Sequence, residues 1–442
     1  MTMSLESDVL ERIKPSEEET KRIRGIADRL KKLTDEYLKA HNINAKLTFV
    51  GSFSKGTFLS NPDLDLFLLF PKNRMKKSIE DICLKMGEEL IHGKKAYAEH
   101  PYSSGEFEGL EVDMVPCYDI EDTSRLMTPV DRSPFHTKYV VSKVDEMMGD
   151  EIRLTKKFMK GIGTYGAEPN VRGFSGYLCE LLTIHYGGFL ELVKAASEWS
   201  DRETIVMEEK GPDFDAPLVL YDPVDSRRNV ASAVHIDTMR EFRLACSEYR
   251  KNPRMEFFFP NERKPMSRRK IAETLKEHGT CLLTVMFDRP DINIDNLHAQ
   301  NWRTREAITK KLEDFEFGVV SAIHSLDDRN IIQIYELKNC ELSETYKHEG
   351  PPVSNTNSEF FLKRWENNPY GEPFQENGRW YVTAERPFRT PIGMLEHEMY
   401  HAGIGKDVDP DSARMLNNGD SIALSDALLM TELLVPMHRW EI

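Results

Sequence analysis

The stretch GSFSKGTFLSNPDLDLFLLF, which runs from Gly51 to Phe70, decides the fold. It begins with a turn rich in glycine and serine, up to Thr57, and ends in DLDLFLLF, which predicts a strand that starts half polar and becomes fully buried. Alternate side chains of a strand point to opposite faces. Asp63 and Asp65 therefore share one face of the predicted strand, while the leucines between them point into a core.

Two carboxylates on one face of a strand repel each other unless a cation lies between them. A third carboxylate, Asp113, lies within a second predicted strand, Gly109 to Tyr118, where an unpaired charge is costly. Hard oxygen ligands favour Mg²⁺, and carboxylates from two neighbouring strands can hold two metal ions that catalyse in-line phosphoryl transfer. The alternative for Asp63 and Asp65 is a pair of strand-end or turn-capping aspartates after Asn61-Pro62.

The elements around this stretch predict a small α/β palm. Ser16 followed by Glu19 is a capping box, and apolar residues recur behind it at helical spacing. The order that follows is strand, turn, strand, helix and strand, at residues 47–50, 51–57, 63–70, 78–92 and 109–118.

Beyond about residue 150 the pattern changes to helices, with Ser175 as an expected N-cap, and from about residue 265 helices alternate with strands. Asn377-Gly378 is a hairpin signal in a tail that is otherwise unassigned beyond about residue 345. We therefore expect an α+β multidomain protein. Its parts are a palm of mixed sheet and helices at residues 1–148, a helical central domain at 149–262 and an α+β C-terminal region at 263–442.

Composition excludes several classes of protein. The chain has 442 residues, of which 40% are hydrophobic and 30% charged, so it is neither disordered nor fibrous. It has no apolar run long enough for a membrane span, no signal core at its N-terminus and six scattered cysteines without a CxxC pair, which favours a reducing cytoplasm. The net charge of -15 confines any contact with RNA to a few basic patches.

The turn and the three carboxylates together resemble the polymerase-beta-like nucleotidyltransferase superfamily. Gly51 and Ser52 open a turn whose small residues let backbone N–H groups approach phosphates, and Lys55 adds a positive charge. The turn is not a Walker loop, because Thr57 follows Gly56 where lysine is required. The resemblance implies a nucleotidyltransferase but does not name its substrate.

Six downstream segments narrow the resemblance. They are AEHPY (98–102), VDMVPCY (112–118), VDRSPFHTKY (130–139), YGAE (165–168), VRGFSGYLCELL (171–182) and DPVDSRRNVA (222–231). In this order they resemble the archaeal class of CCA-adding enzymes, from about residue 10 to about residue 300. The resemblance implies that C, C and A are added to the 3′ end of tRNA from CTP and ATP.

The same resemblance implies roles for individual residues. Asp63, Asp65 and Asp113 would hold the catalytic metals, although many members carry glutamate in place of Asp63. Lys55 stands where arginine is usual, so a bidentate phosphate contact is replaced by a point charge. The residues implied to contact CTP or ATP are Ser52, Lys55, His136, Lys156 and Tyr165, and Arg228 or its neighbour Arg227 is implied to read the base edge. Taken singly, the lysines can be solvated, Tyr165 can cover a core edge and His136 can be a loop histidine.

The C-terminal half is expected to bind the acceptor stem and elbow of tRNA through shape and phosphates. SRRK (267–270) and WRTR (302–305) are the candidate contacts, and a solvated helix face is the alternative for each. The oligomeric state stays open, a homodimer included.

A competing motif, HEMYH at His397 to His401, matches the H-E-x-x-H zinc-protease pattern. The metzincin continuation fails because Ile404 stands where glycine is required. A surface helix with two histidines is therefore the favoured interpretation. Two further hypotheses remain, namely another nucleotidyltransferase such as a poly(A) polymerase, and a noncatalytic RNA-binding relative.

Overall fold

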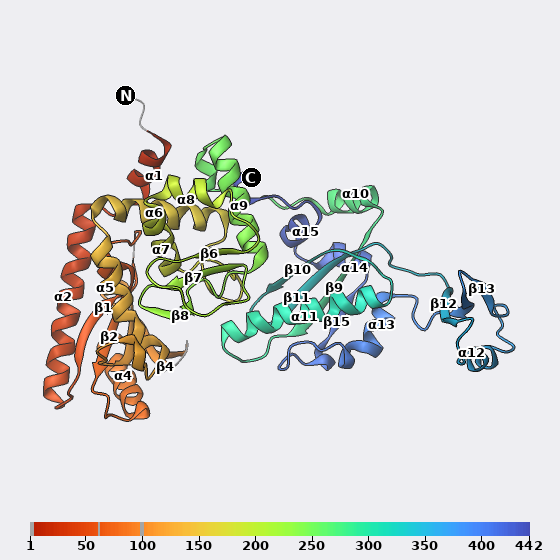
Figure 1. The fold of residues 1–442 in the computed structure, drawn as a ribbon, viewed down its shortest axis with the longest axis horizontal. Helices are drawn as coiled ribbons and strands as arrows, with labels where there is room; N and C mark the ends of the chain where they lie inside the picture. The colour runs from red at the N-terminus through yellow and green to blue at the C-terminus, as the bar shows by residue number, and fades with distance from the viewer. Residues whose placement is uncertain (1–3, 61, 98–100) are drawn as a thin grey trace. The chain divides into compact units, whose positions relative to one another are not determined.

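The computed structural model describes residues 4–60, 62–97 and 101–442. Asn61 of the expected loop and the first three residues of AEHPY lie outside the described residues. The chain forms two compact units (Figure 1). The first extends to Glu262 and also contains the last five residues, His438–Ile442, and the second is Arg263–Met437. The sequence analysis assigned those five residues to the C-terminal region.

The palm of the first unit is a five-stranded sheet in the order β1-β2-β5-β4-β3. β2 pairs parallel with β5 and antiparallel with β1. Leu64, Leu66 and Leu68 point from β2 into a core shared with the helices α2 and α4, as the alternation of the sequence predicts. The strands are β1 (Lys46–Val50), β2 (Leu64–Phe70), β3 (Lys94–Tyr97), β4 (Pro101–Phe107) and β5 (Leu110–Tyr118), and the helices are α2 (Glu17–Ala40) and α4 (Lys76–Ile91).

The predicted start of the long first helix of the palm is confirmed, and the glycine-serine turn differs from its prediction. The Ser16 side chain accepts a hydrogen bond from the backbone N–H of Glu19 at 3.0 Å and caps α2. The glycine-serine turn, however, is a one-turn helix, α3 (Gly51–Lys55). Gly51 and Gly56 have φ angles of 70° and 67°, which glycine adopts at little cost, so they set the two ends of this turn.

The central part of the first unit is mostly helical, as expected, but it also contains a three-stranded sheet in the order β6-β7-β8. Phe158 of α6 lies at the middle of its core, with the rings of Phe189, Tyr249 and Phe257 packed around it. The C-terminal Trp440 stacks on Phe257, which explains why the last residues belong to this unit. The elements are α1 (Leu5–Ile13), α5 (Ser133–Lys143), α6 (Glu146–Ile162), α7 (Gly176–Tyr186), α8 (Phe189–Ala196), α9 (Ile236–Lys251), β6 (Glu203–Ile205), β7 (Leu218–Asp222) and β8 (Asp225–Asn229).

The second unit begins with helix, strand, helix, strand and strand, as the sequence predicts. Its main sheet has the order β10-β11-β9-β15. The elements are α10 (Arg268–His278), β9 (Cys281–Asp288), α11 (Ile294–Asp314), β10 (Val319–Leu326), β11 (Asn330–Leu337), α13 (Pro391–Glu398), β15 (Arg414–Leu416), α14 (Asn418–Leu424) and α15 (Ala427–Leu434).

The unassigned tail contains a separate small sheet, in the order β12-β14-β13. The predicted hairpin turn at Asn377-Gly378 is confirmed, because both residues have positive φ angles and join β13 to β14. The elements are β12 (Thr345–Pro352), α12 (Ser358–Arg364), β13 (Phe374–Glu376) and β14 (Arg379–Glu385). Across the described ranges, we find no helix with the length and apolar character needed to cross a membrane.

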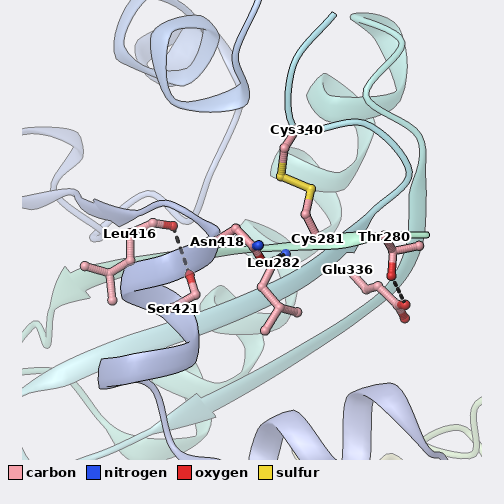
Figure 2. Close-up of a disulfide and its surroundings, with 8 residues drawn as sticks. All are labelled: Thr280, Cys281, Leu282, Glu336, Cys340, Leu416, Asn418 and Ser421. Carbon is pink, nitrogen blue, oxygen red and sulfur yellow. Dashed lines mark hydrogen bonds between the residues drawn. A yellow bond between two sulfur atoms is a disulfide. The ribbon is translucent and has the colours of Figure 1, made fainter. Parts of the chain in front are cut away.

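A disulfide joins Cys281 to Cys340 in the second unit (Figure 2). The two cysteines are 59 residues apart, so no local spacing indicated the pair, and the reducing environment that the scattered cysteines favoured did not predict a disulfide. They meet because β11 runs antiparallel to β9, which places Leu337 opposite Cys281 and returns the chain to the start of β9. The other four cysteines are free and buried: Cys83, Cys117, Cys179 and Cys246.

Candidate active site

Three carboxylates gather at one end of the paired strands β2 and β5. Asp65 and Asp113 are direct partners in the parallel register, and Asp63 immediately precedes β2. Burial, together with the charges of Asp113 and Asp63, raises the pKa of Asp65 to about 6. Burial also raises the pKa of Asp113, although a hydrogen bond with Ser104 opposes the shift. The charge of Asp63 therefore disfavours the charged forms of both Asp65 and Asp113.

A divalent cation bound between these carboxylates would offset their mutual repulsion. Within the described ranges, no three histidine, cysteine or acidic side chains converge into a complete metal cage. The donors are hard oxygens on two neighbouring interior strands of the sheet, and this set fits Mg²⁺ or a similar ion.

The turn before β2 lies directly against this carboxylate set. A Cβ atom built on Gly51 lies 1.8 Å from Oδ2 of Asp65, far inside van der Waals contact. Only glycine fits between the turn and the carboxylate. The same glycine has a positive φ, so both its conformation and its surroundings exclude a side chain.

Lys55 and Lys156 share a single buried counter-ion, Glu180 of α7. Lys55 Nζ lies 2.8 Å from Oε2 of Glu180, and Lys156 Nζ lies 2.8 Å from Oε1. The Thr57 hydroxyl donates to the same carboxylate at 2.6 Å and accepts from Lys156 at 3.0 Å. Burial alone raises the pKa of Glu180, but Lys156 and Lys55 lower it to about 2. The two lysines are therefore buried, and the solvated alternative is wrong for both.

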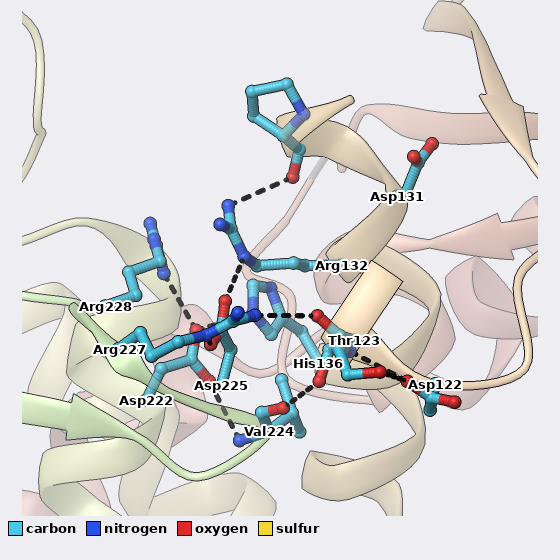
Figure 3. A network of polar contacts seen from close by, with 12 residues as sticks. Asp122, Thr123, Asp131, Arg132, His136, Asp222, Val224, Asp225, Arg227 and Arg228 are labelled. Carbon is cyan, nitrogen blue, oxygen red and sulfur yellow. Dashed lines mark hydrogen bonds and ion pairs between the residues drawn. The ribbon is translucent and has the colours of Figure 1, made fainter. Parts of the chain in front are cut away.

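His136 of α5 lies in a second polar network (Figure 3). Its Nε2 atom lies 2.8 Å from Oδ2 of Asp222, the last residue of β7, and its ring stacks on Tyr177 at 4.1 Å. Arg228 Nη1 donates to the same carboxylate oxygen at 3.0 Å. Arg227 instead donates to Asp225 at 2.9 Å and is more exposed. Of the two candidate arginines, Arg228 is therefore the one linked to His136 through Asp222.

Most of the residues that the sequence singled out line one cavity of about 340 Å³. Tyr165 follows α6 there, and burial raises the pKa of its phenol. Asp63, Asp113 and Arg228 are not among the lining residues. Those that line the cavity are Ser52, Lys55, Asp65, His136, Lys156 and Tyr165.

Sequence reasoning missed Tyr177, Glu180 and Asp222, which hold the expected residues in place. One signal for Glu180 was visible. A carboxylate within the apolar run GYLCELL is costly unless a cation meets it in the fold. The partner lysines, however, come from distant parts of the chain, so the run did not identify them.

The HEMYH segment lacks the geometry of a zinc site. α13 ends at Glu398, so the two histidines do not lie on one continuous α-helix, and Met399–His401 forms a 3-10 turn. Glu398 is paired with Lys311 at 2.6 Å instead of being available as a general base. The surface-helix interpretation agrees with this arrangement.

A glycine turn against paired strand carboxylates, beside a cavity lined with lysines, defines the class of a nucleotidyltransferase. A nucleotidyltransferase domain model matches residues 23–136. Models described as "tRNA nucleotidyltransferase, second domain" and "CCA-adding enzyme, C-terminal domain" match residues 150–259 and 278–417. The chain belongs to the family of CCA-adding enzymes.

Curated relatives named "CCA-adding enzyme" match almost the whole chain. The protein of Thermoplasma volcanium is 36% identical over 91% of this chain and 90% of its own length. That of Picrophilus torridus is 36% identical over 92% of this chain and 94% of its own. That of Halobacterium salinarum is 32% identical over 98% and 96%.

Proposed function

We propose that this protein adds C, C and A to the 3′ end of immature or damaged tRNA, using CTP and ATP and releasing pyrophosphate. The observation that carries the proposal is the pairing of Asp65 with Asp113 behind Gly51, in a chain of this family. We further propose that the protein works in the cytoplasm, where its tRNA and nucleotide substrates are present.

Asp63, Asp65 and Asp113 are the proposed ligands of two Mg²⁺ ions. When bound, such ions lower the pKa of the tRNA 3′-hydroxyl and stabilise the charge that develops on the phosphates. Ser52, at the start of α3, is the proposed hydroxyl donor to the nucleotide phosphates. The raised pKa of Asp65 implies that the carboxylates must lose a proton before they bind metal at acidic pH.

Lys55 and Lys156 are the proposed cationic contacts of the triphosphate. Glu180 neutralises one of their two charges, so the buried group carries one net positive charge toward the cavity. The phenol of Tyr165 is the proposed hydroxyl contact, and His136 and Arg228 are proposed to face the sugar and base. No covalent enzyme intermediate is needed, because the hydroxyl attacks the α-phosphate directly.

Residues 1–148, 149–262 and 263–442 are the proposed catalytic, nucleotide-recognition and tRNA-binding parts. SRRK and WRTR remain the proposed basic contacts of the tRNA acceptor and elbow. Arg269 pairs with Glu273 on its own helix, and Arg305 pairs with Glu306, so RNA phosphates would compete with exposed ion pairs there. Charge reversal of either segment should weaken tRNA binding and reduce its salt dependence.

The test is incubation with Mg²⁺, CTP, ATP and a tRNA transcript that lacks its last three nucleotides. Ordered addition of two C and one A that then stops, and that an Asp63→Ala, Asp65→Ala variant loses, supports the proposal. Long poly(A) products would favour another nucleotidyltransferase. Tight RNA binding without incorporation would favour a noncatalytic relative.

A further inference from the structure

Asp222 is a buried carboxylate on which four donors converge. Its side chain has no exposed surface. Oδ2 accepts from His136 Nε2 at 2.8 Å and from Arg228 Nη1 at 3.0 Å. Oδ1 accepts from the Tyr177 hydroxyl at 3.3 Å and from the backbone N–H of Val224 at 3.1 Å. One residue thus fixes a histidine, a tyrosine and an arginine that come from three separate segments.

Two of these partners face the candidate nucleotide cavity. His136 and Tyr177 both line it, with their rings stacked at an angle of 23°. A carboxylate only accepts hydrogen bonds, so Nε2 of His136 carries the proton and Nδ1 is left as an acceptor. Burial lowers the pKa of His136, although Asp222 opposes the shift, so the neutral ring is favoured at pH 7.

Arg228 has the opposite hydrogen-bonding character. A guanidinium is a fixed fork of five N–H donors with no acceptor. Arg228 directs one donor at Asp222, and its side chain is 35% exposed, which leaves further donors open to a ligand. Because Arg228 and His136 bind the same oxygen atom, the guanidinium and the imidazole are neighbours, and His136 of this pair lines the cavity (Figure 3).

This pairing matches the edge that cytosine and adenine share. Both bases present an amino group beside a ring nitrogen that accepts, whereas uracil and guanine present a carbonyl oxygen beside a ring N–H. An N–H group of Arg228 that is held in position can donate to the ring nitrogen of C or A. In U or G the same N–H group would face a ring N–H, which is a second donor. A site whose polar groups are left unpaired by the wrong ligand discriminates strongly against it.

We propose that Asp222 is a specificity-determining positioning residue, which holds Arg228 as a donor and His136 as an acceptor so that the site admits C and A and rejects U and G. The inference rests on the proposed function, because it assumes that the cavity takes nucleoside triphosphates. Asp222 itself touches no substrate and acts through its two partners.

Asp225 provides a matched control on the same hairpin. It is also buried, and its carboxylate accepts from Arg132 Nε at 3.0 Å and from Arg227 Nε at 2.9 Å. Neither arginine shares a carboxylate with a residue that lines the cavity, whereas Arg228 shares Asp222 with His136. Asp225→Asn therefore removes a similar buried charge from the same strand pair without touching His136 or Arg228.

The experiment measures kcat/KM for CTP and UTP on a tRNA transcript that lacks its last three nucleotides, and for ATP and GTP on a transcript that ends in the two added C residues. Asp222→Asn places an amide N–H₂ against one of the two partners, so we expect the preference for CTP over UTP to fall by about tenfold or more. Asp225→Asn should keep the wild-type preference. Arg228→Lys keeps the positive charge but loses the planar guanidinium, so it should also lose the preference for CTP over UTP. Arg228 is partly exposed, so this second variant keeps the test valid if Asp222→Asn does not fold.

An equal loss of kcat/KM for all four nucleotides in Asp222→Asn would mark a purely structural role and overturn the proposal. Unchanged preference in both Asp222→Asn and Arg228→Lys would overturn it as well. If the wild-type protein adds neither C nor A, the proposed function fails instead, so the two failures are distinguishable.

Discussion

Replacing Gly51 by alanine should disable the site while leaving the fold in place. The new Cβ atom would lie 1.8 Å from Oδ2 of Asp65, whereas real Cβ contacts essentially never fall below 3.0 Å. Either the carboxylate or the turn must therefore retreat by roughly 1 Å. A misplacement of roughly 1 Å in a catalytic group costs on the order of 100-fold in rate. That loss corresponds to about 2.7 kcal/mol of transition-state stabilisation.

Gly56 separates this effect from backbone strain. It lies at the other end of the same turn with a φ of 67°, nearly the 70° of Gly51, and a Cβ atom there meets nothing within 4 Å. Alanine in this left-handed conformation costs about 1–2 kcal/mol at either position. Both variants should therefore lose similar stability in urea denaturation, and only Gly51→Ala should lose kcat.

The assay is single-turnover addition of C to a shortened tRNA at saturating CTP, beside a denaturation curve for each variant. Full activity in a folded Gly51→Ala protein would refute the reasoning, because the position of Asp65 would then not limit catalysis. Equal losses of kcat in the two glycine variants would refute it as well, since strain in the turn would then explain both.

Three other perturbations have defined outcomes. Glu180→Gln leaves two buried ammonium groups without their counter-charge and should cost about 3–5 kcal/mol in urea denaturation. The pKa of Asp65 is raised from 3.8 to about 6 in the folded protein. Protonated Asp65 therefore stabilises the fold fully below pH 3.8, and this contribution is lost as the pH rises through 6. The melting temperature of the metal-free protein should show this loss, and that of Asp65→Asn should not. Reducing the Cys281–Cys340 disulfide, which closes a loop of 59 residues, should destabilise the second unit by up to about 4 kcal/mol.

Each of these outcomes has its own control. Glu191→Gln, at an exposed position of α8, is the control for Glu180→Gln. An equal loss of unfolding free energy in the two variants would mean that Glu180 does not act as the counter-ion. A melting temperature of Asp65→Asn that still follows the wild-type pH curve would assign the titration to another group. For the disulfide, a Cys281→Ser, Cys340→Ser protein should not respond to reductant, and a response would place the effect elsewhere.

The sequence alone determined the features that depend on neighbouring residues. The period of two in DLDLFLLF put Leu64, Leu66 and Leu68 on the core face, and Ser16 and Asn377-Gly378 marked a helix start and a hairpin. These features are local because strand alternation, capping and turn conformation are set within a few residues. The sequence did not predict the short helix at Gly51, because its first residue needs a positive φ, which glycine permits but does not require.

Tertiary structure alone decided which distant groups meet. The register of β2 against β5 placed Asp65 beside Asp113, and the packing of α7 brought Glu180 to Lys55, which lies 125 residues away in the chain. Arg228 pairs with Asp222 whereas Arg227 pairs with Asp225, and no spacing in the sequence separates these two neighbours. Such contacts close long loops, so they depend on the free energy of the whole fold and leave no mark in the spacing of adjacent residues.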